Sequence, residues 1–109
     1  MNLGELIKIL EATGYPVAYS HFIATPGKSV PAPPYICILV DGSANLMADN
    51  KVYHKIDDAN IELYTTKKDL VAEAKLENVL DDNEIPYDSY GAFIETEKLY
   101  QKIYETRLL

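Results

Sequence analysis

The sequence has no tryptophan, a single cysteine and few glycines among its 109 residues. One cysteine, Cys37, excludes a disulfide framework within the chain. No apolar run reaches the roughly 18 residues of a membrane span, and Glu5 and Glu11 interrupt the only apolar stretch near the N-terminus. We therefore expect neither a membrane span nor a signal peptide, and a protein assembled in a reducing cytoplasm.

Basic residues are also scarce, because ten Lys and Arg stand against seventeen Asp and Glu, for a net charge of −7. The excess is confined to residues 57–109, which hold thirteen acids and six bases, while residues 1–56 are balanced. Nucleic-acid binding needs clustered Lys and Arg, so the composition argues against it. An acidic surface instead suits a basic protein partner, and the nine tyrosines are typical of strands and interfaces.

Hydrophobic periodicity predicts a helix, three strands, a second helix and two final strands. The predicted helices cover residues 2–13 and 69–82, and the predicted strands cover 17–23, 35–40, 52–65, 87–96 and 99–109. The segment 52–65 is either one long strand or two collinear pieces. The last segment also fits helical spacing, but its tyrosines and a short turn at residues 97–98 favour a strand. This order predicts a single α+β domain over residues 1–109, with two helices on one face of a small, mainly antiparallel sheet of about five strands.

Several local features refine this prediction. The apolar run at residues 35–40 predicts a central strand covered on both faces, followed by a polar turn over 41–50. The side-chain phase changes within residues 52–65, which predicts a β-bulge at Asp57–Ala59. Thr66 and Asp69 have the spacing of a capping box.

The second helix is predicted to bury an apolar stripe and to keep its charged residues largely outside it. The stripe consists of Ala72, Leu76, Val79 and Leu80, and the residues outside it are Glu73, Lys75, Glu77 and Asn78. Gly91 suggests a bulge in the strand that follows.

Catalytic chemistry has weak support in the sequence. His21 and Cys37 could meet on neighbouring strands as a nucleophilic pair, but a thiol inside the apolar run 35–40 would be buried and inert. Asp57 and Asp58 could act as paired carboxylates, but nothing nearby completes an active site. A zinc site would need His21, His54, Cys37 and carboxylates together. We therefore expect no enzyme, no catalytic residue, no metal and no cofactor.

Two segments are the candidate protein contacts. The first is the proline-rich loop 24–34, which is long for a connection and carries apolar side chains; its contact residues are Pro26, Gly27, Lys28, Val30 and Pro31. The second is the acidic group Asp81, Asp82 and Glu84 after the second helix, whose position opposes the helix dipole. We expect the loop to be ordered only when a neighbour binds it.

Six segments across nearly the whole chain together resemble a family of small phage proteins. The segments cover residues 14–22, 33–37, 48–53, 61–69, 93–101 and 103–105. The family is that of tail-completion proteins, the tail-terminator or head–tail joining proteins of long-tailed phages and prophages of Gram-positive bacteria. The resemblance implies a small sheet flanked by helices and a ring on the end of the tail tube.

The resemblance implies a structural role, with other copies of the chain and tail-tube or head-connector proteins as partners. It places the protein in the host cytoplasm during assembly and then at the head–tail junction of the virion. Terminator, stopper and other minor tail roles stay open. The alternative is a small-molecule-binding or enzymatic α+β domain that uses His21 and Cys37, or Asp57 and Asp58.

Overall fold

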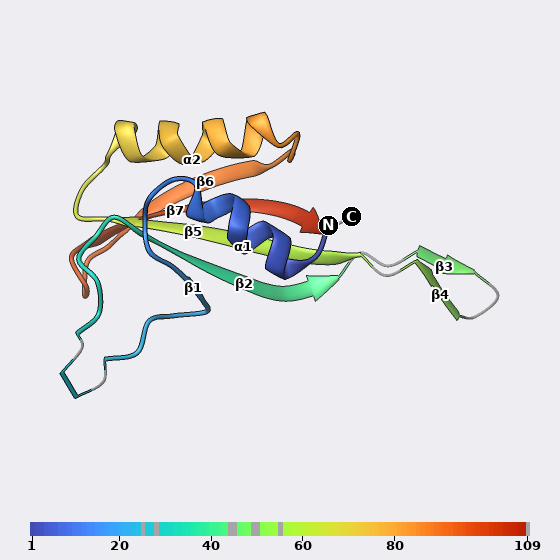
Figure 1. The fold of residues 1–109 in the computed structure, drawn as a ribbon, viewed down its shortest axis with the longest axis horizontal. Helices are drawn as coiled ribbons and strands as arrows, with labels where there is room; N and C mark the ends of the chain where they lie inside the picture. Colours follow the sequence, from blue (N-terminus) through green and yellow to red (C-terminus); the bar gives the residue numbers. More distant parts are fainter. Residues whose placement is uncertain (25, 28, 44–45, 49–50, 55, 109) are drawn as a thin grey trace.

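The part of the chain that the structure describes forms two helices and seven strands, which Figure 1 labels along the ribbon. The computed structural model describes residues 1–24, 26–27, 29–43, 46–48, 51–54 and 56–108, without the side chains of 41, 43, 46–48 and 51–54. The helices are α1 (Leu3–Glu11) and α2 (Leu70–Asp82), and the strands are β1 (Val17–Tyr19), β2 (Tyr35–Ser43), β3 (Leu46–Ala48), β4 (Lys51–His54), β5 (Asp57–Thr65), β6 (Asp88–Ile94) and β7 (Leu99–Leu108). No helix in the described part of the chain is long and apolar enough to cross a bilayer.

Five strands form one sheet in the order β1-β2-β5-β7-β6, while β3 and β4 form a separate hairpin beyond its end (Figure 1). Only β1 and β2 are parallel, and the other neighbours in the sheet are antiparallel. Both helices contribute to a single core on one face of this sheet. The predicted α+β class is confirmed, and so is the strand assignment of the last segment over the helical alternative.

The core depends on strict alternation in β5. Ala59, Ile61 and Leu63 are fully buried under the helices, whereas the residues between them are half-buried on the opposite face. Because adjacent side chains of a strand point to opposite faces, β5 divides the sheet into a core face and an uncovered face. The prediction that residues 35–40 are covered on both faces holds only in part: Cys37 is buried on the uncovered side, but Leu39 there is only half-buried.

The predicted bulge at Asp57–Ala59 is wrong. These residues pair with β7 in unbroken register, and β5 begins at Asp57 as a strand distinct from β4. The register shift lies instead in the neighbouring strand β2, between Val40 and Gly42. The change of side-chain phase along residues 52–65 therefore arises because the segment contains two strands, β4 of the hairpin and β5 of the sheet, and does not indicate a bulge.

The predicted polar turn over residues 41–50 is also wrong in part, because β2 continues to Ser43 and the hairpin strand β3 follows. The strand expected over 17–23 is shorter, since β1 ends at Tyr19. The capping-box prediction is corrected too: the N-cap of α2 is Asp69, whose carboxylate accepts the backbone N–H of Ala72 at 3.0 Å. The aspartate side chain accepts a hydrogen bond from a backbone N–H of the first turn, which has no acceptor within the helix.

The predicted stripe on α2 is largely confirmed, since Ala72, Leu76 and Leu80 are fully buried and Val79 is half-buried. Glu73, predicted outside the stripe, is buried with 6% of its surface exposed. Its Oε1 lies 2.9 Å from Lys68 Nζ and 3.7 Å from Lys102 Nζ. The buried carboxylate is tolerated because two ammonium groups compensate its charge.

Gly91 marks a close approach rather than the suggested bulge, since β6 pairs with β7 in unbroken register. A Cβ at Gly91 would overlap the hydroxyl of Tyr100 and lie 3.2 Å from the backbone oxygen of Gln101. The absence of a side chain at this position therefore allows the Tyr100 ring to cross β6.

Leu76→Ala should reduce the free energy of unfolding by about 2–5 kcal/mol, because Leu76 is fully buried at the centre of the α2 stripe. Chemical denaturation of the purified chain measures this loss. Val71→Ala on the same helix is the matched control, since Val71 is 68% exposed and its truncation should cost little. Equal midpoints for the two variants would contradict the assigned core face.

Candidate protein-interaction surfaces

The structure brings His21 and Cys37 to the same hollow, which has a volume of about 300 Å³. The hollow is lined by Ser20, His21, Phe22, Val30, Tyr35, Cys37, Tyr64 and Glu97. Burial, with a smaller contribution from the negative charge of Glu62, raises the pKa of the Cys37 thiol to about 11. A thiol with such a pKa is protonated at neutral pH, so Cys37 lacks the thiolate that nucleophilic catalysis needs.

His21 is exposed, and its Nδ1 lies 3.0 Å from the hydroxyl of its neighbour Ser20. The side chain of His54 lies outside the described part of the structure. No group of His, Cys, Asp and Glu side chains among the described residues has an arrangement that could hold a metal ion.

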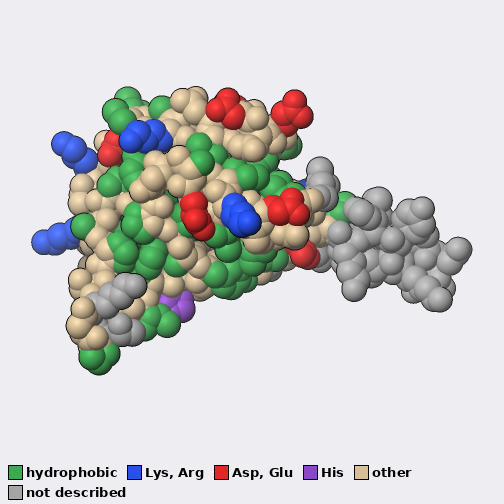
Figure 2. All heavy atoms as spheres, viewed as in Figure 1, with side chains coloured by type: hydrophobic (Ala, Val, Ile, Leu, Met, Phe, Trp, Pro, Cys, Tyr) green, Lys and Arg blue, Asp and Glu red, His purple; other side chains and the backbone are tan. Residues whose placement is uncertain are grey.

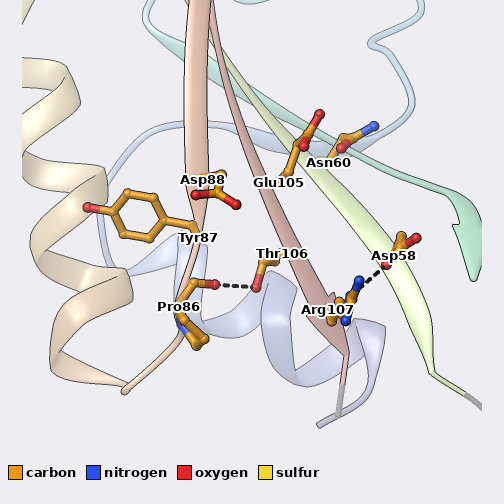
Figure 3. A pocket seen from close by; sticks show the side chains of 8 residues that line it. All are labelled: Asp58, Asn60, Pro86, Tyr87, Asp88, Glu105, Thr106 and Arg107. Carbon is orange, nitrogen blue, oxygen red and sulfur yellow. Dashed lines mark hydrogen bonds and ion pairs between the residues drawn. The ribbon is translucent and has the colours of Figure 1, made fainter. Parts of the chain in front are cut away.

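The structure separates the two carboxylates of the alternative active site. Asp57 pairs with Leu108 on the core side of β5, whereas Asp58 pairs with Arg107 on the uncovered side. The Asp58 carboxylate accepts a hydrogen bond from Arg107 Nε at 3.3 Å (Figure 3). Two adjacent residues that face opposite sides of a sheet do not form an acid–base pair.

The side of the sheet that the helices leave uncovered, which we call the open face, is a surface that the sequence analysis did not identify. It follows from strand register, because residues paired across neighbouring strands share a face. Its residues are Ala18 of β1; Tyr35, Cys37 and Leu39 of β2; Asp58, Asn60, Glu62 and Tyr64 of β5; Leu99, Gln101, Ile103, Glu105 and Arg107 of β7; and Asp88, Tyr90, Ala92 and Ile94 of β6.

One end of the open face is aromatic. The rings of Tyr35 and Tyr64 stack with centroids 5.2 Å apart, and Phe22 meets Tyr35 edge-on at 5.3 Å. Gln101 Nε2 donates to both the Tyr64 hydroxyl and a Glu62 carboxylate oxygen, each at 2.9 Å. Burial and the charge of Glu62 raise the pKa of Tyr64 to about 12, so its phenol stays neutral.

The other end of the open face is acidic and hollowed. A hollow of about 750 Å³ lies there, lined by Asp58, Asn60, Pro86, Tyr87, Asp88, Glu105, Thr106 and Arg107 (Figure 3). Thr106 donates a hydrogen bond of 2.7 Å to the carbonyl of Pro86, which fixes the chain where it enters β6. Asp88 and Glu105 are direct cross-strand partners and both are exposed.

The predicted contact loop is largely exposed. Pro26, Gly27 and Val30 lie at the surface and Pro31 is half-buried, while Lys28 lies outside the described residues. Val30 also lines the smaller hollow beside Cys37, so the loop returns over the aromatic end of the open face. Ile23, just before the loop, is 71% exposed.

The acidic group Asp81, Asp82 and Glu84 is exposed at the C-terminal end of α2. Figure 2 shows carboxylates over this end of α2, whereas lysine side chains gather at the end where α2 begins. The loop and the acidic group lie at opposite corners of the molecule (Figure 1), so the two predicted contacts belong to separate surfaces.

Sequence reasoning missed the open face, although the signal was present. Ile61, Leu63 and Thr65 are every second residue of one strand and are buried on one face. The same alternation assigns Asn60, Glu62 and Tyr64 to the other face, and nothing in the order of elements supplies a helix to cover it.

Cys37→Ser should destabilise the fold by about 1–3 kcal/mol, because it replaces a buried thiol, 3% exposed, by a more strongly hydrated hydroxyl. The native thiol should also react slowly with a thiol reagent at pH 8 and rapidly once the chain is unfolded. Rapid labelling of the native protein would mean that Cys37 is accessible as a thiolate and would restore the nucleophile hypothesis.

Neither the models of known protein families, nor the curated proteins, nor the solved structures contain a match to this chain. Its function must therefore be inferred from the surfaces described above.

Proposed function

We propose that the chain is a structural protein of a phage or prophage tail, a tail-terminator or head–tail joining subunit that forms a ring. The observation that carries this proposal is the presence of two projections at opposite ends of an elongated subunit. The subunit measures 50 × 32 × 26 Å. The β3–β4 hairpin lies beyond one end of the sheet, and the connection 20–34 between β1 and β2, which contains the loop 24–34, lies at the other (Figure 1).

Projections at opposite ends favour head-to-tail contact. A surface at one end of a subunit that binds a different surface at the other end of the next copy produces a ring when the rotation closes. Such contacts differ from a two-fold dimer, in which the same patch occurs on both sides. The whole-chain resemblance to tail-completion proteins gives the ring its proposed place on the tail.

The loop 24–34 is the proposed contact with a neighbouring copy. Its exposed Val30, with Ile23 just before it, presents apolar surface that gains from burial against a partner. Its prolines reduce the backbone entropy that is lost when the loop is held by that partner. The acidic end of α2 is a second proposed contact, for a basic surface of a tail-tube or connector protein.

The free subunit should be a monomer in dilute solution or a labile ring, because its fully buried core can fold without a partner. Light scattering across a concentration series, with negative-stain microscopy at the highest concentration, measures the association. A two-fold dimer that survives dilution to nanomolar concentration would contradict the proposal.

Deletion of Gly27–Val30 should leave the melting temperature nearly unchanged and abolish ring assembly and tail joining. The first effect follows because the deleted segment lies outside the strands and helices, and the second because the contact surface is lost. Thermal melts and complementation of a phage lacking the gene measure the two effects. Ser29→Ala is the matched control within the same loop. An unfolded deletion variant, or one that restores infectivity, would refute the loop contact.

A further inference from the structure

We propose that the open face binds a protein partner whose contact segment combines lysine or arginine side chains with aromatic or aliphatic ones. No described loop residue lines the hollow at its acidic end, whereas Val30 of the loop borders its aromatic end. The proposal is argued from burial, charge and side-chain geometry and does not depend on the phage assignment. It is carried by three properties of the open face: incomplete burial, a net negative charge and a fixed aromatic end.

The first property is that apolar side chains on inner strands lie half-exposed. Ile103 of β7 and Leu39 of β2 both occupy strands with neighbours on each side, yet no helix covers them. Aromatic Tyr64 on the central strand β5 is half-buried as well. A sheet face with apolar residues at its centre gains free energy when a partner removes them from water.

The second property is charge. The open face carries four carboxylates and one base, so its formal net charge is −3; the carboxylates are Asp58, Glu62, Asp88 and Glu105 and the base is Arg107. Asp88 and Glu105 face each other across β6 and β7, an arrangement of like charges that destabilises a strand pair. Among the described residues neither carboxylate makes an ion pair. A cationic side chain placed in the hollow beside them would relieve this repulsion.

The negative charge of the open face also determines which kind of partner can bind there. Two copies meeting through their open faces would bring eight carboxylates together with two arginines, and each chain already carries −7. Such an interface would repel itself, whereas a partner rich in Lys and Arg is attracted from a distance and held on contact. The open face therefore fits a basic protein and not a second copy.

The third property is that the aromatic end is already fixed. Gln101 ties together Glu62 and Tyr64, and Tyr64 stacks on Tyr35, so little side-chain entropy remains to be lost on binding. Tyrosine rings contact both apolar side chains and the cationic groups of Lys and Arg. A contact segment that alternates basic and aromatic residues would thus meet matching chemistry along the face.

The test uses the purified chain and two labelled twelve-residue peptides, one alternating lysine with tyrosine and the other alternating lysine with serine. Fluorescence anisotropy at physiological salt should show that the lysine–tyrosine peptide binds several-fold more tightly, because only it contacts the aromatic end. Equal affinity for the two peptides would overturn the proposal, since the charge alone would then explain the binding.

A pair of matched variants locates the binding site. Asp88→Asn with Glu105→Gln removes two charges from the open face, and Glu5→Gln with Glu11→Gln removes two from exposed positions on α1. The first double variant should weaken peptide binding by about tenfold and the second should leave it nearly unchanged. Equal losses would show a general charge effect and overturn the assigned surface.

Two further measurements distinguish lost binding from unfolding and from self-association. Melting curves should show both double variants at least as stable as the parent, because all four substitutions are at exposed positions and preserve side-chain shape, and the first also removes a repulsive cross-strand pair. Sedimentation should show that removing the charges at Asp88 and Glu105 leaves self-association unchanged. Loss of an assembly in that variant would instead identify a second copy as the occupant and overturn the basic partner, while leaving the proposed ring intact.

Discussion

The alternation of β5 is the constraint on which the rest of the molecule depends. This central strand pairs with both β2 and β7, and its odd-numbered residues from Ala59 to Leu63 are fully buried beneath the helices. A shift of one residue would bring Asn60, Glu62 and Tyr64 into the core and expose the apolar set. The register that protects the core therefore also determines which side chains form the open face, so stability and the proposed recognition depend on the same pairing.

The orientation of α2 on the sheet depends on two polar contacts within an interface that is otherwise apolar. Glu73 lies near Lys68 and Lys102, while Glu77 accepts a hydrogen bond of 3.0 Å from the fully buried hydroxyl of Tyr104. Burial and this hydrogen bond raise the pKa of Tyr104, which keeps its phenol a donor. Directional contacts of this kind favour one orientation of the helix, whereas Leu76 and Leu80 supply attraction without direction.

Periodicity was enough to predict the α+β class, both helices and the final strand, because each depends on a pattern within a few consecutive residues. The start of β5 at Asp57 and the burial of Glu73 could not be predicted this way. The strand depends on its distant partner β7, and the Glu73 carboxylate is paired with distant Lys102 as well as with nearby Lys68. The open face was missed for a related reason. Alternation assigns residues to a face, but only the packing of α1 and α2 decides which face is covered.

The proposed ring contacts and the proposed contact with a basic partner use different parts of the subunit. The hairpin β3–β4 and the loop 20–34 lie at opposite ends of the sheet, so contacts between neighbours in a ring would use the ends of the subunit. The open face spans all five strands between those ends, and its acidic hollow, which no described loop residue lines, stays available when both ends are occupied. Because its charge disfavours a second copy, it suits a partner of different composition. One subunit would thus bind its own kind through its ends and another protein through its sheet, because the negative charge of the open face repels a second copy.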